Sequence, residues 1–296
     1  MTPLKPRQAA AISRLFSSSV IRELARRGKS PLFARLARQA LLLSAPAASM
    51  RVHDLFDEAF SLLQQEGSRD EYIYKAALIC KILLGRHSLQ TASMLSEFRV
   101  GECKADLAIL NGTATVYEIK SERDSLARLR KQVEAYATVF AKVNVIASES
   151  HIASIEAMVS PDVGMFVLNR RYRISMIREA AEKPEQTSPE AIFNSIRTDE
   201  ARRVLILNGI CVADVPNTKL NSELREHFIR LDPVKAHNGM VQVLKETRNL
   251  RPLSSLVARL PRSLHVAALA VPLRKLDHER LVNAVNTPLN VAASWA

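Results

Sequence analysis

The sequence contains little glycine and few cysteines. Its 296 residues include 8 Gly, 3 Cys and 1 Trp. Scarce glycine beside abundant Ala, Leu and Arg favours helix over strand. The cysteines, Cys80, Cys103 and Cys211, are widely spaced and form no CxxC pair, which argues against a zinc site or a disulfide framework. Unpaired thiols are typical of a reducing compartment, so we expect a cytoplasmic protein.

Long hydrophobic runs are also missing. The longest apolar stretches are shorter than the roughly 20 residues that a membrane-spanning helix needs, so we expect no membrane span. Hydrophobic residues make up 47% of the chain and charged residues 24%, which is an ordinary globular composition. The length is sufficient for one or two domains with a substantial core.

Charge is plentiful but unevenly distributed. The net charge is +12. Residues 1–50 carry nine Lys/Arg and one acid, residues 51–170 carry 14 and 16, and residues 171–296 carry 19 and 13. Basic flanks around a near-neutral middle favour a polyanionic partner, because each neutralised phosphate releases condensed counterions. The alternative is a pair of solvated basic faces without a ligand.

The basic N-terminal segment predicts one or two amphipathic helices over residues 8–43, with a break at Gly28 and Pro31. Such helices could form a nucleic-acid arm, lie on a membrane surface or pack on the core. A stretch rich in Ser, Ala and Pro at residues 44–49 predicts a linker. We therefore divide the chain into a basic helical arm (1–50), a central domain (51–170) and a mainly helical C-terminal domain (171–296).

The central domain alternates helical and β-rich segments. We predict helices at 53–65, 69–84, 123–140 and 151–159, and strands at 94–100, 105–110, 113–119, 143–147 and 164–168. Asn111-Gly112 separates two of these strands and is a strong hairpin signal. The order predicts an α/β fold with a mixed central sheet flanked by helices.

Three charged residues on this hairpin suggest a chemical site. Glu118 and Lys120 are two apart on one strand, so their side chains leave the same face, and the hairpin returns Asp106 beside them. Two carboxylates can hold Mg²⁺, which activates water and polarises a phosphoryl oxygen, while a lysine stabilises developing negative charge. The alternative is a surface hairpin with an ordinary Glu/Lys pair.

The hairpin turn decides whether the two carboxylates can meet. A two-residue Asn111-Gly112 loop would set Asp106 opposite Tyr117, which places Asp106 and Glu118 on opposite faces of the sheet. A metal site that uses both carboxylates therefore requires an odd number of loop residues, or a β-bulge between the turn and the two acids. The simplest solution has three loop residues, with Gly112 in the left-handed conformation.

Further residues around the hairpin complete a recognisable pattern. Its parts are Asp106-Leu107-Ala108-Ile109, Glu118-Ile119-Lys120-Ser121, Arg128-Leu129-Arg130-Lys131-Gln132 and the spacing Gln132-x-x-x-Tyr136. This pattern resembles the PD-(D/E)XK nuclease superfamily, in its RecB-like branch, and is most similar to small uncharacterised bacterial and phage proteins. The resemblance covers residues 66–168, about a third of the chain, and departs from the family at Ala105, where a proline is usual.

The resemblance implies a restriction-endonuclease-like αβββαβ core with helical N- and C-terminal extensions. It also implies hydrolysis of phosphodiester bonds with Mg²⁺ or Mn²⁺, with DNA as the expected substrate. The implied metal ligands are Asp106, Glu118 and, through water, Glu71, with Glu66 as the second choice and Glu97 also suggestive. The implied catalytic residues are Asp106, Glu118, Lys120, Gln132 and Tyr136. The alternative is a catalytically silent module of the same fold that binds nucleic acid or a protein.

Overall fold

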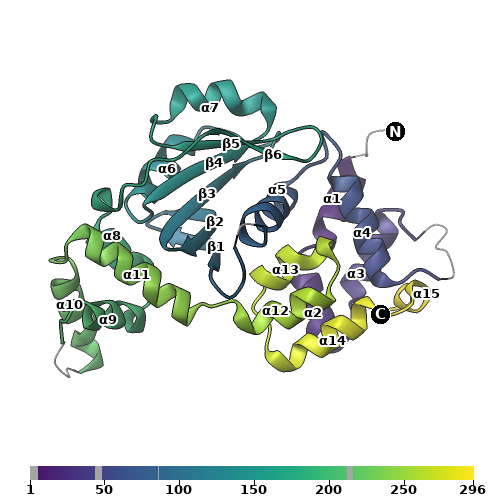
Figure 1. The fold of residues 1–296 in the computed structure, drawn as a ribbon. Helices are drawn as coiled ribbons and strands as arrows, with labels where there is room; N and C mark the ends of the chain where they lie inside the picture. The colour runs from purple at the N-terminus through teal and green to yellow at the C-terminus, as the bar shows by residue number, and fades with distance from the viewer. Residues whose placement is uncertain (1–5, 44–48, 86, 212–215) are drawn as a thin grey trace. The chain divides into compact units, whose positions relative to one another are not determined.

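A computed structural model describes residues 6–43, 49–85, 87–211 and 216–296 (Figure 1). The linker expected at 44–49 lies almost wholly outside these residues. The chain forms two compact units. Unit 1 comprises Met1–Ile82, Arg170–Tyr172 and Arg251–Ala296, and unit 2 comprises Leu83–Asn169 and Arg173–Leu250. These boundaries differ from those expected near residues 50 and 170, because both ends of the chain contribute to unit 1.

Unit 1 is helical. Its main helices are α1 (Pro6–Leu15), α2 (Ser18–Arg27), α3 (Pro31–Gln39), α4 (Val52–Leu63), α5 (Glu71–Leu78), α12 (Ser254–Arg259), α13 (His265–Ala270), α14 (Lys275–Val285) and α15 (Leu289–Ala292). A π-helical segment, Ile79–Leu83, continues α5. The basic N-terminal segment thus holds three helices where we predicted one or two. Ser17 and Ser30 cap α2 and α3, and Gly28, with φ of 71°, ends α2.

The N-terminal helices are packed into the core of unit 1. Their apolar residues are buried, and Leu15, Leu24 and Phe33 are 0% exposed. Phe16 stacks on Tyr72 with ring centroids 4.5 Å apart. A backbone bridge between Arg51 and Pro288 joins the two ends of the chain. Of the three alternatives for this segment, packing on the core is therefore observed.

Unit 2 contains a six-stranded mixed sheet with the strand order β1-β2-β3-β4-β5-β6. The strands are β1 (Ser93–Val100), β2 (Cys103–Asn111), β3 (Thr113–Lys120), β4 (Lys142–Ala147), β5 (Gly164–Leu168) and β6 (Ile174–Arg178). β3, β4 and β5 are parallel neighbours, and the other pairs are antiparallel. The five predicted strands and the α/β class are confirmed. β6 was not predicted, since we expected a mainly helical region after residue 169.

The β2–β3 hairpin has the odd register that a shared site requires. Leu110 pairs with Ala114 and Asn111 with Thr113, so Gly112 is at the tip, where its φ is 76°. Glycine accepts this left-handed conformation without strain. Continued along the strands, this register sets Asp106 opposite Glu118. The two-residue turn is therefore excluded, and the prediction of an odd loop is confirmed.

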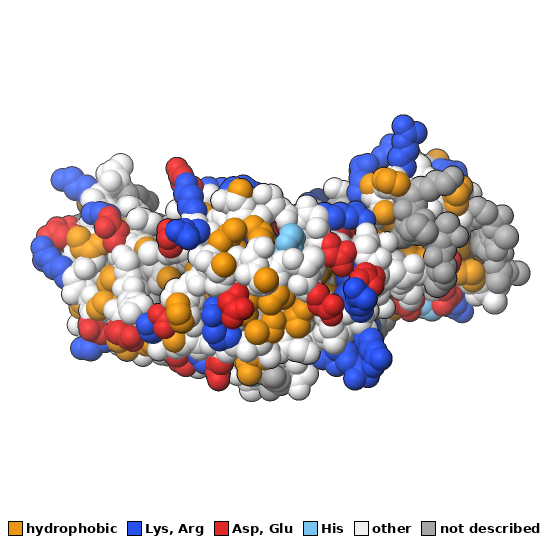
Figure 2. All heavy atoms as spheres, turned by 90° about the horizontal axis from the view of Figure 1, so that it is seen from above, with side chains coloured by type: hydrophobic (Ala, Val, Ile, Leu, Met, Phe, Trp, Pro, Cys, Tyr) orange, Lys and Arg blue, Asp and Glu red, His pale blue; other side chains and the backbone are white. Residues whose placement is uncertain are grey.

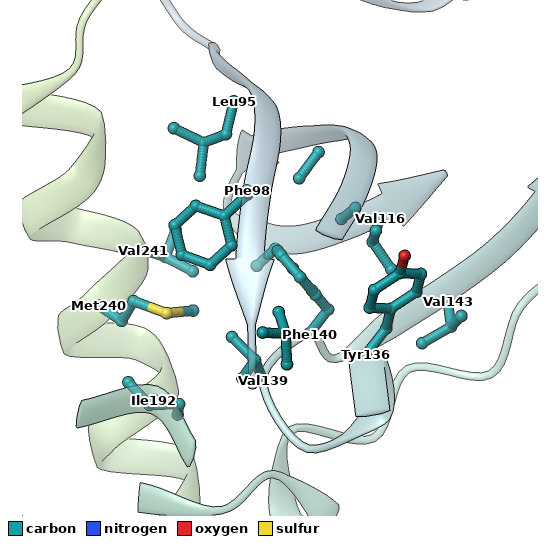
Figure 3. Packing of buried hydrophobic residues seen from close by; sticks show 14 of the residues in the cluster. Leu95, Phe98, Val116, Tyr136, Val139, Phe140, Val143, Ile192, Met240 and Val241 are labelled. Atoms are coloured by element: carbon teal, nitrogen blue, oxygen red, sulfur yellow. The ribbon is translucent and has the colours of Figure 1, made fainter. Parts of the chain in front are cut away.

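Helices cover the sheet face that carries Glu118. The helices of unit 2 are α6 (Leu129–Ala137), α7 (Ile152–Met158), α8 (Pro189–Ser195), α9 (Thr198–Leu207), α10 (Asn217–Phe228) and α11 (Pro233–Thr247). Helices α6, α8 and α11 contact the strands, and α9 and α10 pack on α8 and α11. Figure 3 shows Phe98 and Val116 of the sheet among Tyr136, Phe140 and Met240, all buried. This packing fixes α6 against the strands that carry the candidate site.

The helix predicted at 123–140 begins only at Leu129. Asp124 explains the delay, because its Oδ2 accepts hydrogen bonds from the backbone N and side-chain Oγ of Ser121 at 2.8 and 2.7 Å. This local turn competes with helix formation. Within the described residues, no helix is both long and apolar enough to cross a membrane.

Candidate active site

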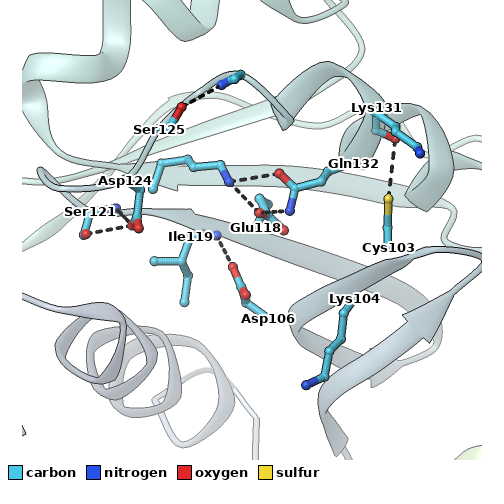
Figure 4. Close-up of polar contacts among 12 residues, drawn as sticks. Cys103, Lys104, Asp106, Glu118, Ile119, Ser121, Asp124, Ser125, Lys131 and Gln132 are labelled. Carbon is cyan, nitrogen blue, oxygen red and sulfur yellow. Dashed lines mark hydrogen bonds and ion pairs between the residues drawn. The ribbon is translucent and has the colours of Figure 1, made fainter.

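The candidate site lies where β2, β3 and α6 come together (Figure 4). Even-numbered residues of β3 face α6, so Glu118 and Lys120 point toward the helix, whereas Ile119 points away and is 3% exposed. Gln132 and Tyr136 are four residues apart on α6 and therefore share one side of the helix. Two neighbouring strands and one helix thus supply the five residues expected to be catalytic.

Glu118 is the centre of the polar network. Its side chain is 2% exposed, and Oε1 accepts hydrogen bonds from Lys120 Nζ at 2.8 Å and Gln132 Nε2 at 2.6 Å. Oε2 accepts a hydrogen bond from the hydroxyl of Tyr136 at 2.8 Å. A buried carboxylate needs such partners, because leaving water without them is costly.

Lys120 is buried beside Glu118. The residue is 6% exposed, and its ammonium also donates to Gln132 Oε1 at 2.9 Å. Gln132 therefore uses both ends of its amide, with the NH₂ group on the carboxylate and the oxygen on the ammonium. This triangle fixes the positions of Glu118 and Lys120 relative to each other.

Tyr136 connects the network to the backbone of β2. Its hydroxyl oxygen lies 2.9 Å from the carbonyl oxygen of Lys104 and 2.8 Å from Glu118 Oε2. Burial, reinforced by the negative charge of Glu118, raises the pKa of Tyr136 well above its ordinary value. The phenol therefore stays neutral and serves as a hydrogen-bond donor.

Asp106 lies on β2 and is hydrogen-bonded to β3 at the residue that follows Glu118. Its residue is half-buried, and Oδ2 accepts a hydrogen bond from the backbone N of Ile119 at 2.7 Å. Regular β2–β3 pairing ends at Leu107 and Tyr117. Beyond this point, the Asp106 side chain accepts the hydrogen bond of the Ile119 backbone N–H in place of a backbone carbonyl. The bond holds the Asp106 carboxylate beside the strand end that carries Glu118.

Glu97 on β1 is a neighbour of Asp106. The strand register sets the two residues opposite each other, and a carboxylate oxygen of one lies within 4.8 Å of one of the other. Glu97 is exposed, has a φ of 58° and pairs with Lys104 at 2.5 Å. A positive φ is unusual for a residue with a side chain. Glu97 and Asp106 therefore both contribute carboxylates on the β2 side of the site.

Glu71 and Glu66, the further metal ligands expected from sequence, belong to unit 1. Glu71 is exposed at the first position of α5 and pairs with Lys75 at 2.5 Å. Glu66 is exposed and pairs with Arg170 at 3.0 Å. Both already have cationic partners, and their role at the site in unit 2 stays a prediction.

The donor set of Asp106 and Glu118 fits a hard divalent cation. Both residues offer carboxylate oxygens, which Mg²⁺ and Mn²⁺ prefer over nitrogen or sulfur. Glu118 already accepts three hydrogen bonds, so a cation held between the two carboxylates would replace at least one of these donors. Metal binding is therefore expected to rearrange the network around Glu118.

Sequence reasoning missed two contributors to the site. Lys104 acts through its backbone carbonyl, which no side-chain pattern can reveal. The turn that follows β3 depends on Asp124, and its spacing from Ser121 is a known turn and capping pattern. That spacing signals a turn after β3, but it also matches the start of a helix, so it does not by itself place the start of α6 at Leu129.

Comparison with known proteins identifies the family of the chain. The profile of the family described as Bacteriophage P4 protein cII matches residues 64–251, which is more than half of the chain and includes the five residues described above. Protein cII of Enterobacteria phage P4 is 37% identical over 93 residues, which are 31% of this chain and 35% of that protein. The alignment thus spans about a third of the relative, whose name describes no activity.

No solved structure matches the chain. The expected relation to phage proteins is confirmed by the family match and by the relative from phage P4. The chain belongs to the Bacteriophage P4 protein cII family.

Proposed function

We propose that this protein is a metal-dependent nuclease that hydrolyses phosphodiester bonds, with DNA as its substrate. The main support is the hairpin register, which sets Asp106 opposite Glu118 and on the same sheet face as Lys120. An even loop would have separated the two carboxylates. The order α5-β1-β2-β3-α6-β4 agrees with the αβββαβ order implied by the resemblance, which is further support for the proposal.

In this proposal Asp106 and Glu118 hold Mg²⁺ or Mn²⁺. When bound, the cation lowers the pKa of a water ligand and polarises the phosphoryl group. The ammonium group of Lys120 lies beside Glu118, where it would stabilise the negative charge that develops on the phosphate. Asp106 is the more accessible carboxylate and would form the outer side of the metal site.

Gln132 and Tyr136 position the charged groups. Gln132 holds Lys120 and Glu118 together, and Tyr136 fixes the second oxygen of Glu118. Because both donors lie on α6, a small shift of this helix would release Glu118 toward a metal. Their proposed task is orientation of the reacting groups.

A second candidate function is a nuclease-fold module that binds nucleic acid or protein without cleavage. The observation that favours it is the burial of Glu118, which is 2% exposed and has hydrogen bonds to both oxygens. In that case the network is a purely structural element.

A cleavage assay distinguishes the two candidates. Purified protein would be incubated with single- and double-stranded DNA and RNA in Mg²⁺, Mn²⁺ or EDTA. We expect metal-dependent cleavage of DNA by the wild type and by Glu134→Gln, which alters an exposed acid on α6, and none by Asp106→Asn. Calorimetry with Mn²⁺ gives a second readout, in which Asp106→Asn should bind more weakly. Absence of both cleavage and Mn²⁺ binding in the wild type would favour the silent module.

A further inference from the structure

The net positive charge of the protein is confined to one unit. Unit 1 carries 21 Lys/Arg and 9 Asp/Glu, whereas unit 2 carries 21 of each. The whole net charge of +12 therefore belongs to unit 1. Unit 2, which contains the candidate site, is neutral overall and has no net attraction for a polyanion before a metal binds.

Much of this charge is on α1, α2, α3 and the turns between them. Residues 6–43 contain eight cations, and all are exposed: Arg7, Arg14, Arg22, Arg26, Arg27, Lys29, Arg35 and Arg38. The segment has one acid, Glu23, whose Oε2 accepts hydrogen bonds from Ser30 Oγ at 2.6 Å and Leu32 N at 3.3 Å. Glu23 is thus engaged at the start of α3, and the exposed charge of the segment is almost entirely positive.

Four of these exposed cations lie on α2 or directly after it, and we call them the α2 basic face: Arg22, Arg26, Arg27 and Lys29. The opposite side of α2 is buried through Val20, Ile21, Leu24 and Ala25, so the cations are held on a rigid helix. Lys and Arg side chains project from the molecular surface in Figure 2.

Helix α14 adds charge at the end of α2. Arg280 donates from Nη1 to the backbone carbonyl of Arg26 at 2.7 Å. Its side chain also lies beside Gly28, the C-cap of α2. The carbonyl end of a helix has partial negative charge, which offsets the repulsion among these cations.

The chemistry of the α2 basic face favours a phosphate backbone over a membrane. A helix that lies on a membrane inserts apolar side chains among the lipids. Here the apolar side chains of α1 to α3 are buried, and Leu41 is the one large exposed hydrophobic residue among described residues 6–43. Arginine forks match phosphate oxygens well.

We propose that the α2 basic face of unit 1 binds the phosphodiester backbone of nucleic acid and supplies most of the affinity for the substrate. Cleavage is then the task of the neutral unit 2. This inference rests on the proposed function for the identity of the substrate, but binding can be measured without cleavage.

The test is the salt dependence of binding to a fluorescein-labelled DNA duplex, measured by anisotropy in EDTA between about 50 and 200 mM salt. The variant Arg22→Gln/Arg26→Gln/Arg27→Gln should lower the slope of log K against log salt by about two to three, because each neutralised phosphate contributes about 0.9. Replacing the same three residues with lysine should keep the wild-type slope. Equal melting temperatures would show that the variants are folded.

A matched variant in unit 2 removes the same formal charge. Arg203, Arg225 and Arg230 are exposed and paired with Glu246, Glu190 and Glu226, and their triple replacement by Gln should leave the slope unchanged. The inference is overturned by an unchanged slope in the α2 variant, by an equal loss in the unit 2 variant, or by no binding of DNA.

Preference for phosphatidylserine vesicles over DNA would also overturn it. Failure of the nuclease proposal alone gives a distinct result. Wild-type protein would then bind DNA with the predicted salt dependence but would cleave no nucleic acid in Mg²⁺ or Mn²⁺. If the wild type cleaves DNA but the α2 variant keeps the wild-type salt slope, the nuclease proposal stands and the binding role of the α2 basic face is wrong.

Discussion

Replacement of Lys120 by alanine should destabilise unit 2 as well as abolish cleavage. Lys120 and Glu118 are paired at 2.8 Å, with side chains 8% and 2% exposed. Removing one member of a buried pair leaves an uncompensated charge and typically costs about 3–5 kcal/mol. Glu118 would keep hydrogen bonds from Gln132 and Tyr136, so we expect the lower end, about 3 kcal/mol. That is a large fraction of a typical domain stability of roughly 5–15 kcal/mol.

The double variant Glu118→Gln/Lys120→Met tests the cause of this loss. It removes both charges while keeping the side-chain volumes similar, and such replacements are often close to neutral. We therefore expect it to be more stable than Lys120→Ala, with a coupling energy of about 2 kcal/mol between the two positions.

Urea unfolding followed by far-ultraviolet circular dichroism measures these differences. Lys131→Ala is the matched control, because Lys131 and Glu102 form an exposed pair with side chains 67% and 84% accessible, and its midpoint should not change. The reasoning is refuted if Lys120→Ala unfolds at the wild-type urea concentration, or if the double variant is as unstable as the single one.

Three further predictions concern other parts of unit 2. Asp106→Asn keeps an oxygen that can accept the hydrogen bond from Ile119, so kinetic assays should show a loss of about a hundredfold or more in cleavage rate with an unchanged urea midpoint. Gly112→Val forces a branched side chain into a φ of 76°, and chemical unfolding should show a loss of roughly 1–2 kcal/mol; equal stability would contradict the observed turn. Burial opposes ionisation of Glu200, but hydrogen bonds led by Arg248 hold its pKa below the ordinary 4.5. Its stabilising contribution is therefore complete above pH 4.5 and is lost as the pH falls through the lowered pKa; melting curves of Glu200→Gln should show a weaker acid loss than wild type.

The alternation of helices and strands in the central region was predictable because it depends on local patterns. Five strands and the helices between them follow from β-rich runs and apolar periodicity. The hairpin is more instructive. Asn111-Gly112 favours an even loop on local grounds, whereas shared chemistry at Asp106 and Glu118 requires an odd one. The observed register agrees with the requirement of the site.

Features that depend on distant contacts could not be predicted. The two ends of unit 1 are joined by the Arg51–Pro288 bridge and by packing of α14 on α2, and no local sequence pattern predicts these contacts. The burial of Glu118 and Lys120 depends on how α6 packs over the sheet, so the sequence indicated charges on one face but not their mutual pairing. β6 was missed because Ile174–Arg178 is too short to stand out before a helical region.

The discontinuous construction of unit 1 determines the order in which the protein can fold during synthesis. Val52 donates its backbone N–H to Thr287 and Leu289 donates to Met50, so these bonds can form only after residues 287–289 have been synthesised. All of unit 2 leaves the ribosome earlier and can fold first, as domains generally do. Until α14 emerges, α2 lacks the helix on which it packs, so a stalled chain would present a folded unit 2 beside uncovered apolar helices, which are targets for chaperones.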